Sequence, residues 1–242
     1  MRAQIVKAND DAIHNTHHVG PTNLFLHSLF SEVDITSNDT LVTSSNNTYA
    51  YRSYLETLLS YGHGSKASQF TSALYYKDVA NHMENANPND DNIENVGFKT
   101  RSALTREGRV VDMLGGIHSD LFFQDRFLPN DVNIKIRLVR NKDAFCLMSS
   151  AAGAAFKVRI LECKLYVRKV KLSPSVFLAH AKVLEVGNAK FPIRRAVCKT
   201  FTIPAGNLDA THESLFTGQL PTRIVIGCVY NEAFNGSYKK NP

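Results

Sequence analysis

The sequence predicts a mainly β protein, an antiparallel jelly-roll sandwich with two short helices. Three observations lead to this prediction. Several segments alternate apolar and polar residues with a period of two, which is typical of strands that have one buried face. Only two segments follow helical spacing. Those two helices do not alternate with the strands, and this argues against a Rossmann-like fold or an α/β barrel.

The clearest expected strand is 132–138, where apolar residues occupy every even position and polar residues every odd one between them. A second alternating segment, 156–160, continues to 167 with a shift of one residue that is typical of a β-bulge. Residues 222–229 form a β-rich apolar run after Pro221, long enough for a buried strand. Further expected strands are 2–7, 23–35, 41–43, 116–123 and 197–203.

The two expected helices have recognisable boundaries. Residues 49–61 carry apolar groups at helical spacing, with Thr48 placed as an N-cap. Residues 174–186 follow Ser173 as N-cap, begin with a proline and end before Gly187, which is a strong boundary pattern. The polar, acidic segment 81–97 is expected to be a long surface loop.

Composition excludes several classes of protein. Apolar residues make up 43% and charged residues 21%, which excludes wholesale disorder and a coiled coil. No apolar run approaches the ~18 residues of a membrane-spanning helix, and residues 1–11 lack the apolar core of a secretory signal. The four cysteines are far apart and form no CxxC pair, so we expect buried, reduced thiols in the cytosol or nucleus: Cys146, Cys163, Cys198 and Cys228.

Positive charge is concentrated in one part of the chain. Residues 132–200 hold 15 basic and 3 acidic residues, although the whole chain has a net charge of only +6. On adjacent strands these side chains would form a positive face for phosphate groups; the alternative is a solvated or interprotein face. The candidate anion-facing residues are Lys135, Arg137, Arg140, Lys157, Arg159, Arg168, Lys169 and Lys171.

One histidine is a candidate for metal or acid–base chemistry. His118 and Asp120 lie two residues apart on an expected strand and so share a face, with Asp112 nearby in the sequence. A cupin-like site needs several histidines from neighbouring strands, and only one is found here. The alternative is a strand histidine with hydrogen-bonded neighbours. Phosphate-binding glycine loops and a nucleophile elbow are also absent from the sequence, so we expect no enzyme, no catalytic or metal-binding residues and no cofactor.

The chain resembles the major capsid proteins of adintoviruses and of Polinton (Maverick) elements. The resemblance covers nearly the whole chain and depends on no single generic motif; copies of this family also occur in animal genomes as uncharacterised proteins. The segments that carry it are 19–33, 44–59, 120–126, 136–148, 167–176, 179–182, 191–195, 218–221 and 233–242.

The resemblance implies a double jelly roll. Residues 1–172 would form a first jelly roll lacking its first strand or two, 173–187 a connecting helix, and 188–242 the start of an incomplete second jelly roll. Relative to the family, the chain would be truncated at both ends.

The family also implies a structural function in a virion. Three chains would form a pseudo-hexameric capsomer of a shell around double-stranded DNA, with partners such as a penton subunit, possible contact with the genome and no membrane. We expect an intracellular or virion location, not secretion, and self-association without closed shells. The competing functions are a nucleic-acid-binding β module that uses residues 132–200 and a cupin-like metalloprotein around His118.

Overall fold

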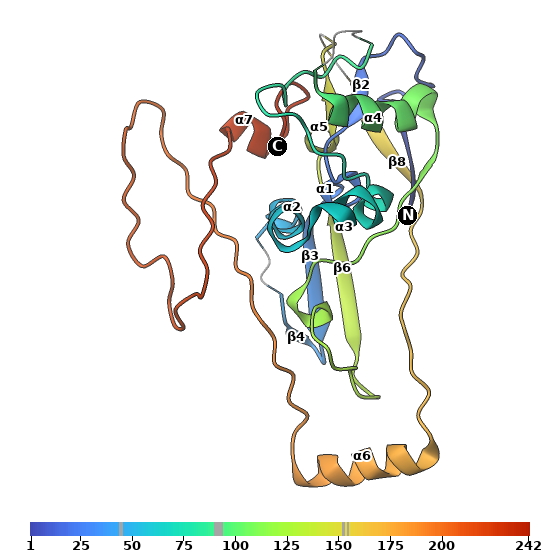
Figure 1. Ribbon diagram of the computed structural model, residues 1–242, viewed down its shortest axis with the longest axis vertical. Helices are drawn as coiled ribbons and strands as arrows, with labels where there is room; N and C mark the ends of the chain where they lie inside the picture. Colours follow the sequence, from blue (N-terminus) through green and yellow to red (C-terminus); the bar gives the residue numbers. More distant parts are fainter. Residues whose placement is uncertain (44–45, 90–93, 152, 154) are drawn as a thin grey trace.

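The computed structural model describes residues 1–43, 46–89, 94–151, 153 and 155–242. The described residues up to 162, together with 231–242, form a packed body, and residues 163–230 form an arm that extends away from it (Figure 1). The strands of the body are β1 Arg2–Lys7, β2 Val19–Pro21, β3 Phe30–Ser37, β4 Thr40–Leu41, β5 Val111–Asp112, β6 Ile134–Arg140, β7 Leu147–Ser149 and β8 Phe156–Glu162. Its α-helices are α1 Phe25–Ser28, α2 Tyr49–Ser60, α3 His63–Ala67, α4 Val96–Thr105, α5 Asp143–Cys146 and α7 Asn231–Asn235, and the arm holds α6 Pro174–Val186. Short 3-10 helices are η1 Gln69–Ala73, η2 Arg106–Gly108 and η3 Asp120–Phe122.

The strands of the described residues pair in three small antiparallel sheets, ordered β5-β1-β8, β2-β7 and β4-β3-β6. In the third sheet Ile35 lies opposite Ile136 and Asp34 lies opposite Arg137. Apolar and charged pairs therefore occupy opposite faces, as a period of two requires. The expected antiparallel strands are present, but helical residues (27%) outnumber strand residues (17%). The jelly-roll arrangement and the division into two such domains stay predictions.

Three of the expected strands form at or close to their predicted positions. Segment 2–7 forms β1 over its whole predicted length. The alternating segment 132–138 corresponds to β6, which begins two residues later, and 156–160 corresponds to β8. The expected continuation of β8 to residue 167 does not form. β8 pairs with β1, and the first residue of β1, Arg2, lies opposite Glu162. Residues beyond Glu162 therefore have no neighbouring residue of β1 for their backbone hydrogen bonds.

Other expected strands adopt different structures. Residues 197–203 and 222–229 are extended and exposed, and neither pairs with another described segment. Segment 23–35 is divided by α1, which follows Leu24 in a left-handed conformation with φ 56°, and only its second part enters β3. Segment 116–123 holds η3 instead of a strand. Segment 41–43 contributes only Leu41 to the short β4.

Both expected helices are confirmed as α2 and α6, within one residue of their predicted bounds. Thr48 precedes α2 but does not cap it with its side chain; its hydroxyl donates to Asn46 instead. The sequence did not predict α4. This helix begins at Val96, within the segment 81–97 for which the sequence predicts an acidic surface loop. Residues 90–93 of that loop lie outside the described residues.

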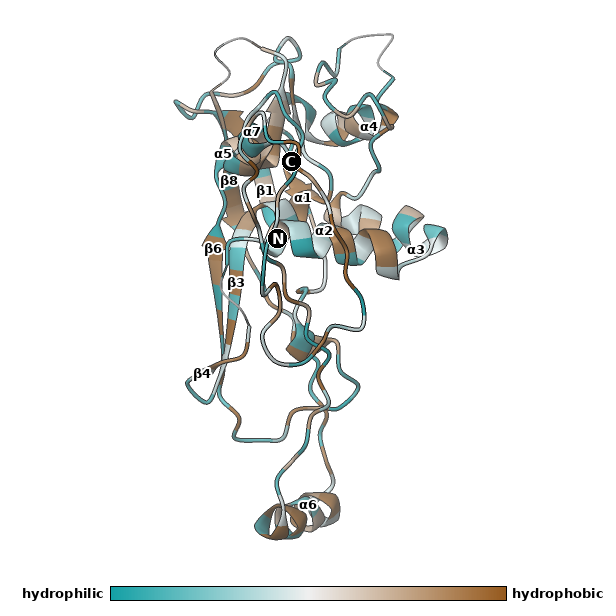
Figure 2. Cartoon of the chain, turned by 90° about the vertical axis from the view of Figure 1, so that its left-hand side faces the viewer, coloured by the Kyte–Doolittle hydropathy of each residue, from teal (hydrophilic) through white to brown (hydrophobic). Residues whose placement is uncertain are grey.

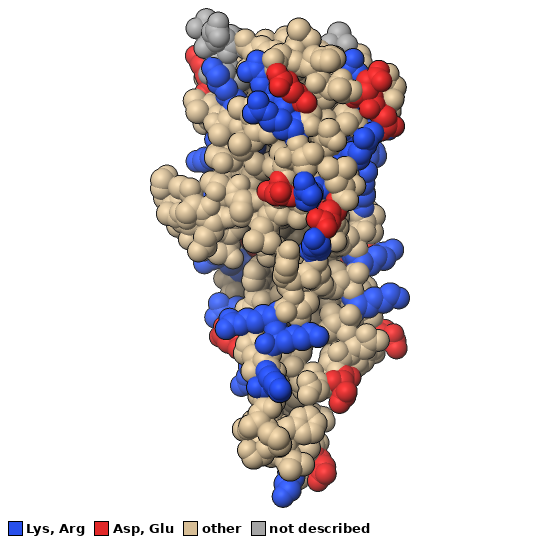
Figure 3. Space-filling view, turned by 90° about the vertical axis from the view of Figure 1, so that its right-hand side faces the viewer, with Lys and Arg blue, Asp and Glu red and all other residues tan. Residues whose placement is uncertain are grey.

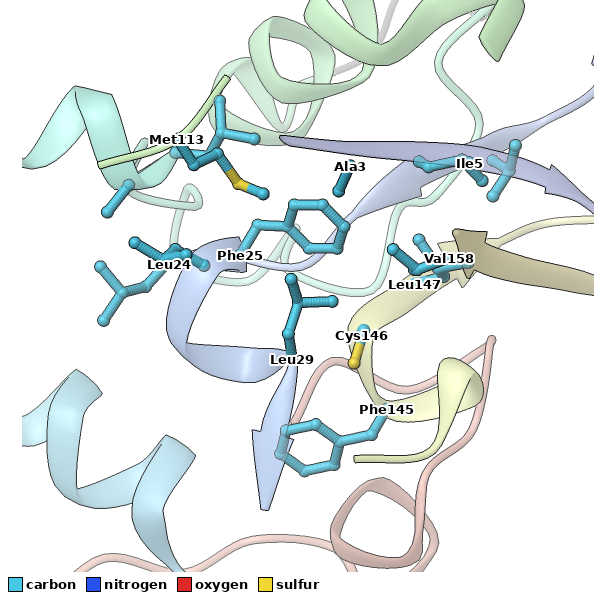
Figure 4. Close-up of a cluster of buried hydrophobic side chains, with 14 of the residues drawn as sticks. Ala3, Ile5, Leu24, Phe25, Leu29, Met113, Phe145, Cys146, Leu147 and Val158 are labelled. Atoms are coloured by element: carbon cyan, nitrogen blue, oxygen red, sulfur yellow. The ribbon is translucent and has the colours of Figure 1, made fainter. Parts of the chain in front are cut away.

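The core of the body brings together α1, α5 and strands from two of the sheets (Figure 4). Phe25 and Leu29 from α1 and its C-cap meet Leu147 of β7 and Val158 of β8, and all four side chains are fully buried. Burial of this apolar surface is the main source of stability for the body.

The chain returns to this core after the arm. The Tyr238 hydroxyl donates to the Phe156 carbonyl at 2.6 Å, and the Ser149 amide donates to the Tyr238 carbonyl at 2.8 Å. The ring of Phe234 in α7 stacks on Tyr51 with a centroid distance of 5.6 Å. Both ends of the arm are therefore fixed to the body.

Candidate functional site

The most unusual feature of the molecule is the arm. It consists of an outgoing leg, 163–173, the helix α6, and a returning segment, 187–230. The structure describes all of these residues, and none of them is buried. The most exposed large apolar side chains are Tyr166, Val186, Leu208, Leu220 and Ile226. An apolar surface of this extent on a chain marks an interaction surface.

The helix α6 lies at the far end of the arm and is largely apolar (Figure 2). At 100° per residue, Val176 and Val183 point to one side, Phe177 and Leu184 to the next, and Val186 to the opposite side. A helix that is apolar on all sides is normally enclosed, not laid on a surface with one face in water. Among the described residues, no helix combines the length and apolar character needed to cross a bilayer.

The accessible surface of the chain gives the scale of this exposure. The chain exposes 15903 Å², whereas a compact chain of 27.0 kDa is expected to expose about 11,000 Å². The excess of about 5,000 Å² is comparable with the area buried in obligate interfaces between subunits.

The arm also carries the positive charge of the molecule. It holds ten basic and three acidic residues, whereas the body holds 18 basic and 19 acidic residues. Arg168, Lys169 and Lys171, three of the predicted anion-facing residues, lie on the outgoing leg, where no described acidic side chain is within ion-pair distance of them. Figure 3 shows Lys and Arg side chains along the lower half of the face that carries this leg.

Two of the other predicted basic residues, on β6, are neutralised by carboxylates. Arg137 forms ion pairs with Asp34 across the sheet at 2.5 Å and with Glu32 at 2.9 Å. Arg140 pairs with Asp143 at 2.6 Å, and its guanidinium also donates to a carbonyl of β8. Lys135 is exposed on β6 and forms no ion pair within the described part of the chain.

The remaining two basic residues, on β8, share one carboxylate. Lys157 pairs with Asp10 at 2.7 Å, and Arg159 pairs with the other oxygen of the same carboxylate. Hydrogen bonds from Lys157 and Arg159 lower the pKa of Asp10. Because β6 and β8 belong to different sheets, the two strands are not neighbours and do not form the single positive face that adjacent strands would give.

His118 lies in a buried cluster of polar side chains. Its Nδ1 donates to Glu56 at 2.8 Å, and Glu56 accepts a second bond from Arg52 Nε at 2.9 Å. Arg52 also pairs with Asp120, so this predicted neighbour of His118 joins the cluster through the arginine. Burial works against the charge of Glu56, but the bonds from His118 and Arg52 lower its pKa.

Two further residues of α1 and α2 complete this cluster. The His27 ring packs edge-on against His118 at 4.7 Å, and its Nδ1 lies 3.0 Å from the Tyr49 hydroxyl. Asp112, the other predicted neighbour of His118, pairs with Arg2 elsewhere. Within the described ranges, no group of three or more His, Cys, Asp or Glu residues is placed to hold a metal ion. The geometry therefore favours the hydrogen-bonded histidine over a metal ligand.

Glu56, Arg52 and His27 are not among the residues that the sequence predicts for this site. A signal for the first two is present, because Arg52 and Glu56 are four residues apart on one face of the expected helix. Their approach to His118 depends on the packing of α2 against a distant segment, which no local pattern reports.

This cluster lies beside the returning segment of the arm. Asp120 accepts a hydrogen bond from the Ala196 amide at 3.3 Å, and the Asn46 side chain donates to the Cys198 carbonyl. Arg126 donates to the Lys190 carbonyl at 2.6 Å. The arm therefore touches its own body through a few polar contacts, with Phe191 and Ile193 half-buried beside them, while most of its apolar side chains stay exposed.

The cluster predicts a pH-dependent stability. Burial, assisted by the nearby His118, lowers the pKa of His27 to about 3. In the unfolded chain His27 takes up a proton below about pH 6.5, whereas in the folded chain its ring stays neutral until the pH approaches 3. Protonation therefore favours the unfolded chain, and the free energy of unfolding falls as the pH drops from 6.5 towards 3. Between pH 6.5 and pH 5 the free energy of unfolding should fall by about 2 kcal/mol through this group.

Urea unfolding of wild type and His27→Gln at both pH values measures this contribution. The variant should lose about 2 kcal/mol less than wild type between the two pH values. The control His63→Gln, which changes an exposed histidine, should keep the wild-type dependence. Equal pH dependence in His27→Gln and wild type would contradict the prediction.

All four cysteines are unpaired in the structure, and their reduced state in the cell stays a prediction. Their expected burial is correct only for Cys146, and burial raises the pKa of that thiol to about 12. Cys163 and Cys228 are exposed on the arm and Cys198 is half-buried there. The apolar residues nearest to these three cysteines in the sequence are themselves exposed. Apolar neighbours in the sequence therefore did not predict the burial of Cys163, Cys198 and Cys228 correctly.

Comparison with known proteins gives one informative relative. The chain is 27% identical over 226 residues to an uncharacterised protein of Caenorhabditis elegans, and the match covers 92% of this chain. The chain spans about half the length of that relative, because the match covers 50% of it. No protein-family model matches the chain. No solved structure matches it either.

Proposed function

We propose that the chain is a structural subunit, a major capsid protein or a domesticated copy of one, from a double-stranded DNA virus or a virus-like transposon. The observation that carries this proposal is the arm, whose apolar side chains are exposed along 68 residues from 163 to 230. A capsid subunit buries such surface only when copies assemble, so an extended and exposed segment in the single chain is expected of it.

The resemblance to adintovirus and Polinton capsid proteins supports the same function. It extends into the arm, because segments 167–176, 179–182, 191–195 and 218–221 all lie there. The antiparallel strands of the body are compatible with a jelly-roll fold, which would need the exposed segments 197–203 and 222–229 to gain strand partners. The double jelly roll and the trimeric capsomer are parts of this proposal.

Light scattering coupled to size exclusion, followed by electron microscopy of the separated species, tests the proposed function. The purified 242-residue chain should form oligomers whose proportion rises with concentration, with a discrete species of three copies. A variant with fewer apolar groups on α6, Leu178→Gln/Leu184→Gln, should form fewer oligomers while its body melts at the wild-type temperature. A wild-type chain that stays monomeric at every concentration would contradict the proposal.

A second candidate function is nucleic-acid binding. The observation that favours it is the group Arg168, Lys169 and Lys171, which have no acidic partner among the residues that the structure describes. Its signature is duplex-DNA affinity that falls steeply with salt and is reduced by Arg168→Glu/Lys169→Glu. If wild type binds DNA in this way and forms no oligomers, nucleic-acid binding replaces the structural function.

A further inference from the structure

One surface of the body matches the arm in chemistry. At one end of the β4-β3-β6 sheet, the β3–β4 turn meets the loop that leads into β6. The Asn38 amide donates to the Asn133 carbonyl at 3.0 Å, and the Asn133 amide donates to Asn38 Oδ1 at 2.9 Å. We use the name sheet end for this junction together with β4 and the loop that leads from η3 into β6; its exposed apolar and acidic residues are Asp39, Leu41, Phe123, Asp125, Phe127 and Asp131.

The sheet end is both apolar and acidic. Leu41 and Phe123 are each 50% exposed and Phe127 is 60% exposed. Asp39, Asp125 and Asp131 are exposed and form no ion pair with any described residue. On the neighbouring strands and loop there are two further acidic residues, Glu32 and Asp34, and four basic ones, Arg126, Lys135, Arg137 and Arg140. With these six the region holds five acidic and four basic groups.

The arm has the opposite charge and the same apolar character. The arm holds ten basic and three acidic residues, whereas the region around the sheet end has an excess of acidic residues. Complementary charge of this kind fixes the orientation of two partners and speeds their encounter. Contact between two arms would instead bring like charges together, which costs several kcal/mol. The charge pattern therefore favours contact between an arm and a sheet end.

The arm of the same chain does not cover the sheet end. Its returning segment passes this region and touches the body through Asn46, Asp120 and Arg126, yet most apolar groups of both surfaces stay exposed. In Figure 1 the backbone of the outgoing leg and that of the returning segment run on either side of this end of the sheet, and α6 lies beyond it. A second copy offers an uncovered sheet end to each arm, and the excess exposed surface of about 5,000 Å² is enough for an obligate interface.

We propose that the arm of each copy docks on the sheet end of a second copy. The proposal rests on the proposed structural function and deepens it, because it names the two surfaces through which copies meet. A lipid surface fits the arm less well, since a helix at a membrane surface gathers its apolar residues on one face, whereas Val176, Phe177 and Val186 of α6 point to three different sides. DNA would pair with the basic residues but would leave the apolar side chains of the arm uncovered.

Two charge variants with opposite effects test this contact in the 242-residue chain. The arm variant, Arg194→Glu/Arg195→Glu, lowers the net charge by four. The sheet-end variant, Asp39→Asn/Asp125→Lys/Asp131→Asn, raises it by four. Asn is used at positions 39 and 131 because their φ angles of 61° and 65° are left-handed, and Asn tolerates that conformation. The control Lys99→Glu/Arg109→Glu makes the same change of four charges on exposed residues of the body.

Sedimentation velocity measures self-association of each variant and of an equimolar mixture of the arm and sheet-end variants. Each variant alone should associate about tenfold more weakly than wild type, because the arm variant lowers the net charge of the arm from +7 to +3 and the sheet-end variant makes the sheet end positive. The mixture should recover association, because the unmutated arm of the sheet-end variant can then meet the unmutated, acidic sheet end of the arm variant. The control should associate like wild type.

The outcomes separate this inference from the proposed function. If wild type forms discrete oligomers and the mixture does not recover association, the arm does not dock on the sheet end, while the structural function stands. Equal weakening by the control would also overturn the inference, since net charge alone would explain it. If wild type stays monomeric and binds only duplex DNA or phosphatidylserine vesicles, both the inference and the proposed function fail.

Discussion

Arg101→Met should lower the free energy of unfolding by about 3–5 kcal/mol, because it breaks a buried ion pair. Arg101 is fully buried on α4, and its Nη2 donates to Asp78 at 2.7 Å. Its Nε donates to the Pro21 carbonyl at 3.0 Å, and its Nη1 donates to the carbonyl of Tyr76. The substitution removes this donor from a buried carboxylate, a buried carbonyl and a half-buried carbonyl. Each of these groups keeps the cost of its desolvation without the bond that offset it.

Urea unfolding of Arg101→Met beside Lys99→Met measures this effect. Lys99 lies two residues earlier on the same helix and is exposed, so its substitution should change the free energy of unfolding by about 0.5 kcal/mol or less. The double variant Arg101→Met/Asp78→Asn should recover part of the loss, because it removes the unpaired charge. Similar losses in Arg101→Met and Lys99→Met would contradict the buried ion pair.

Leu29→Ala should lower the free energy of unfolding by about 2–5 kcal/mol, through lost apolar burial and the cavity that remains. Leu29 follows α1 and is completely buried in the core cluster beside Phe25 and Leu147. Interiors are packed closely, so the neighbouring side chains can fill only part of the space left by the missing methyl groups.

The matched control is Leu104→Ala, because Leu104 on α4 is 42% exposed. Thermal unfolding should show a large fall in melting temperature for Leu29→Ala and a small one for Leu104→Ala. If both variants melt at the same temperature, the body lacks the close-packed core that surrounds Leu29.

The local pattern of the sequence determined several elements of this protein. The alternation in 132–138 and 156–160 placed β6 and β8, because period-two burial is a property of neighbouring residues along one strand. Ser173, Pro174 and Gly187 marked the ends of α6 correctly, because helix boundaries depend on the conformations of a few adjacent residues. The distribution of Lys and Arg along the sequence also located the basic part of the chain.

Tertiary structure alone decided which of these elements have partners. Segment 222–229 has the composition of a strand, but a strand needs a neighbour for its backbone hydrogen bonds, and in this chain no described segment lies beside it. The approach of Glu56 to His118 and of Arg101 to Asp78 joins residues 62 and 23 positions apart. Such contacts depend on how helices and loops pack in space, so no local pattern in the sequence could report them.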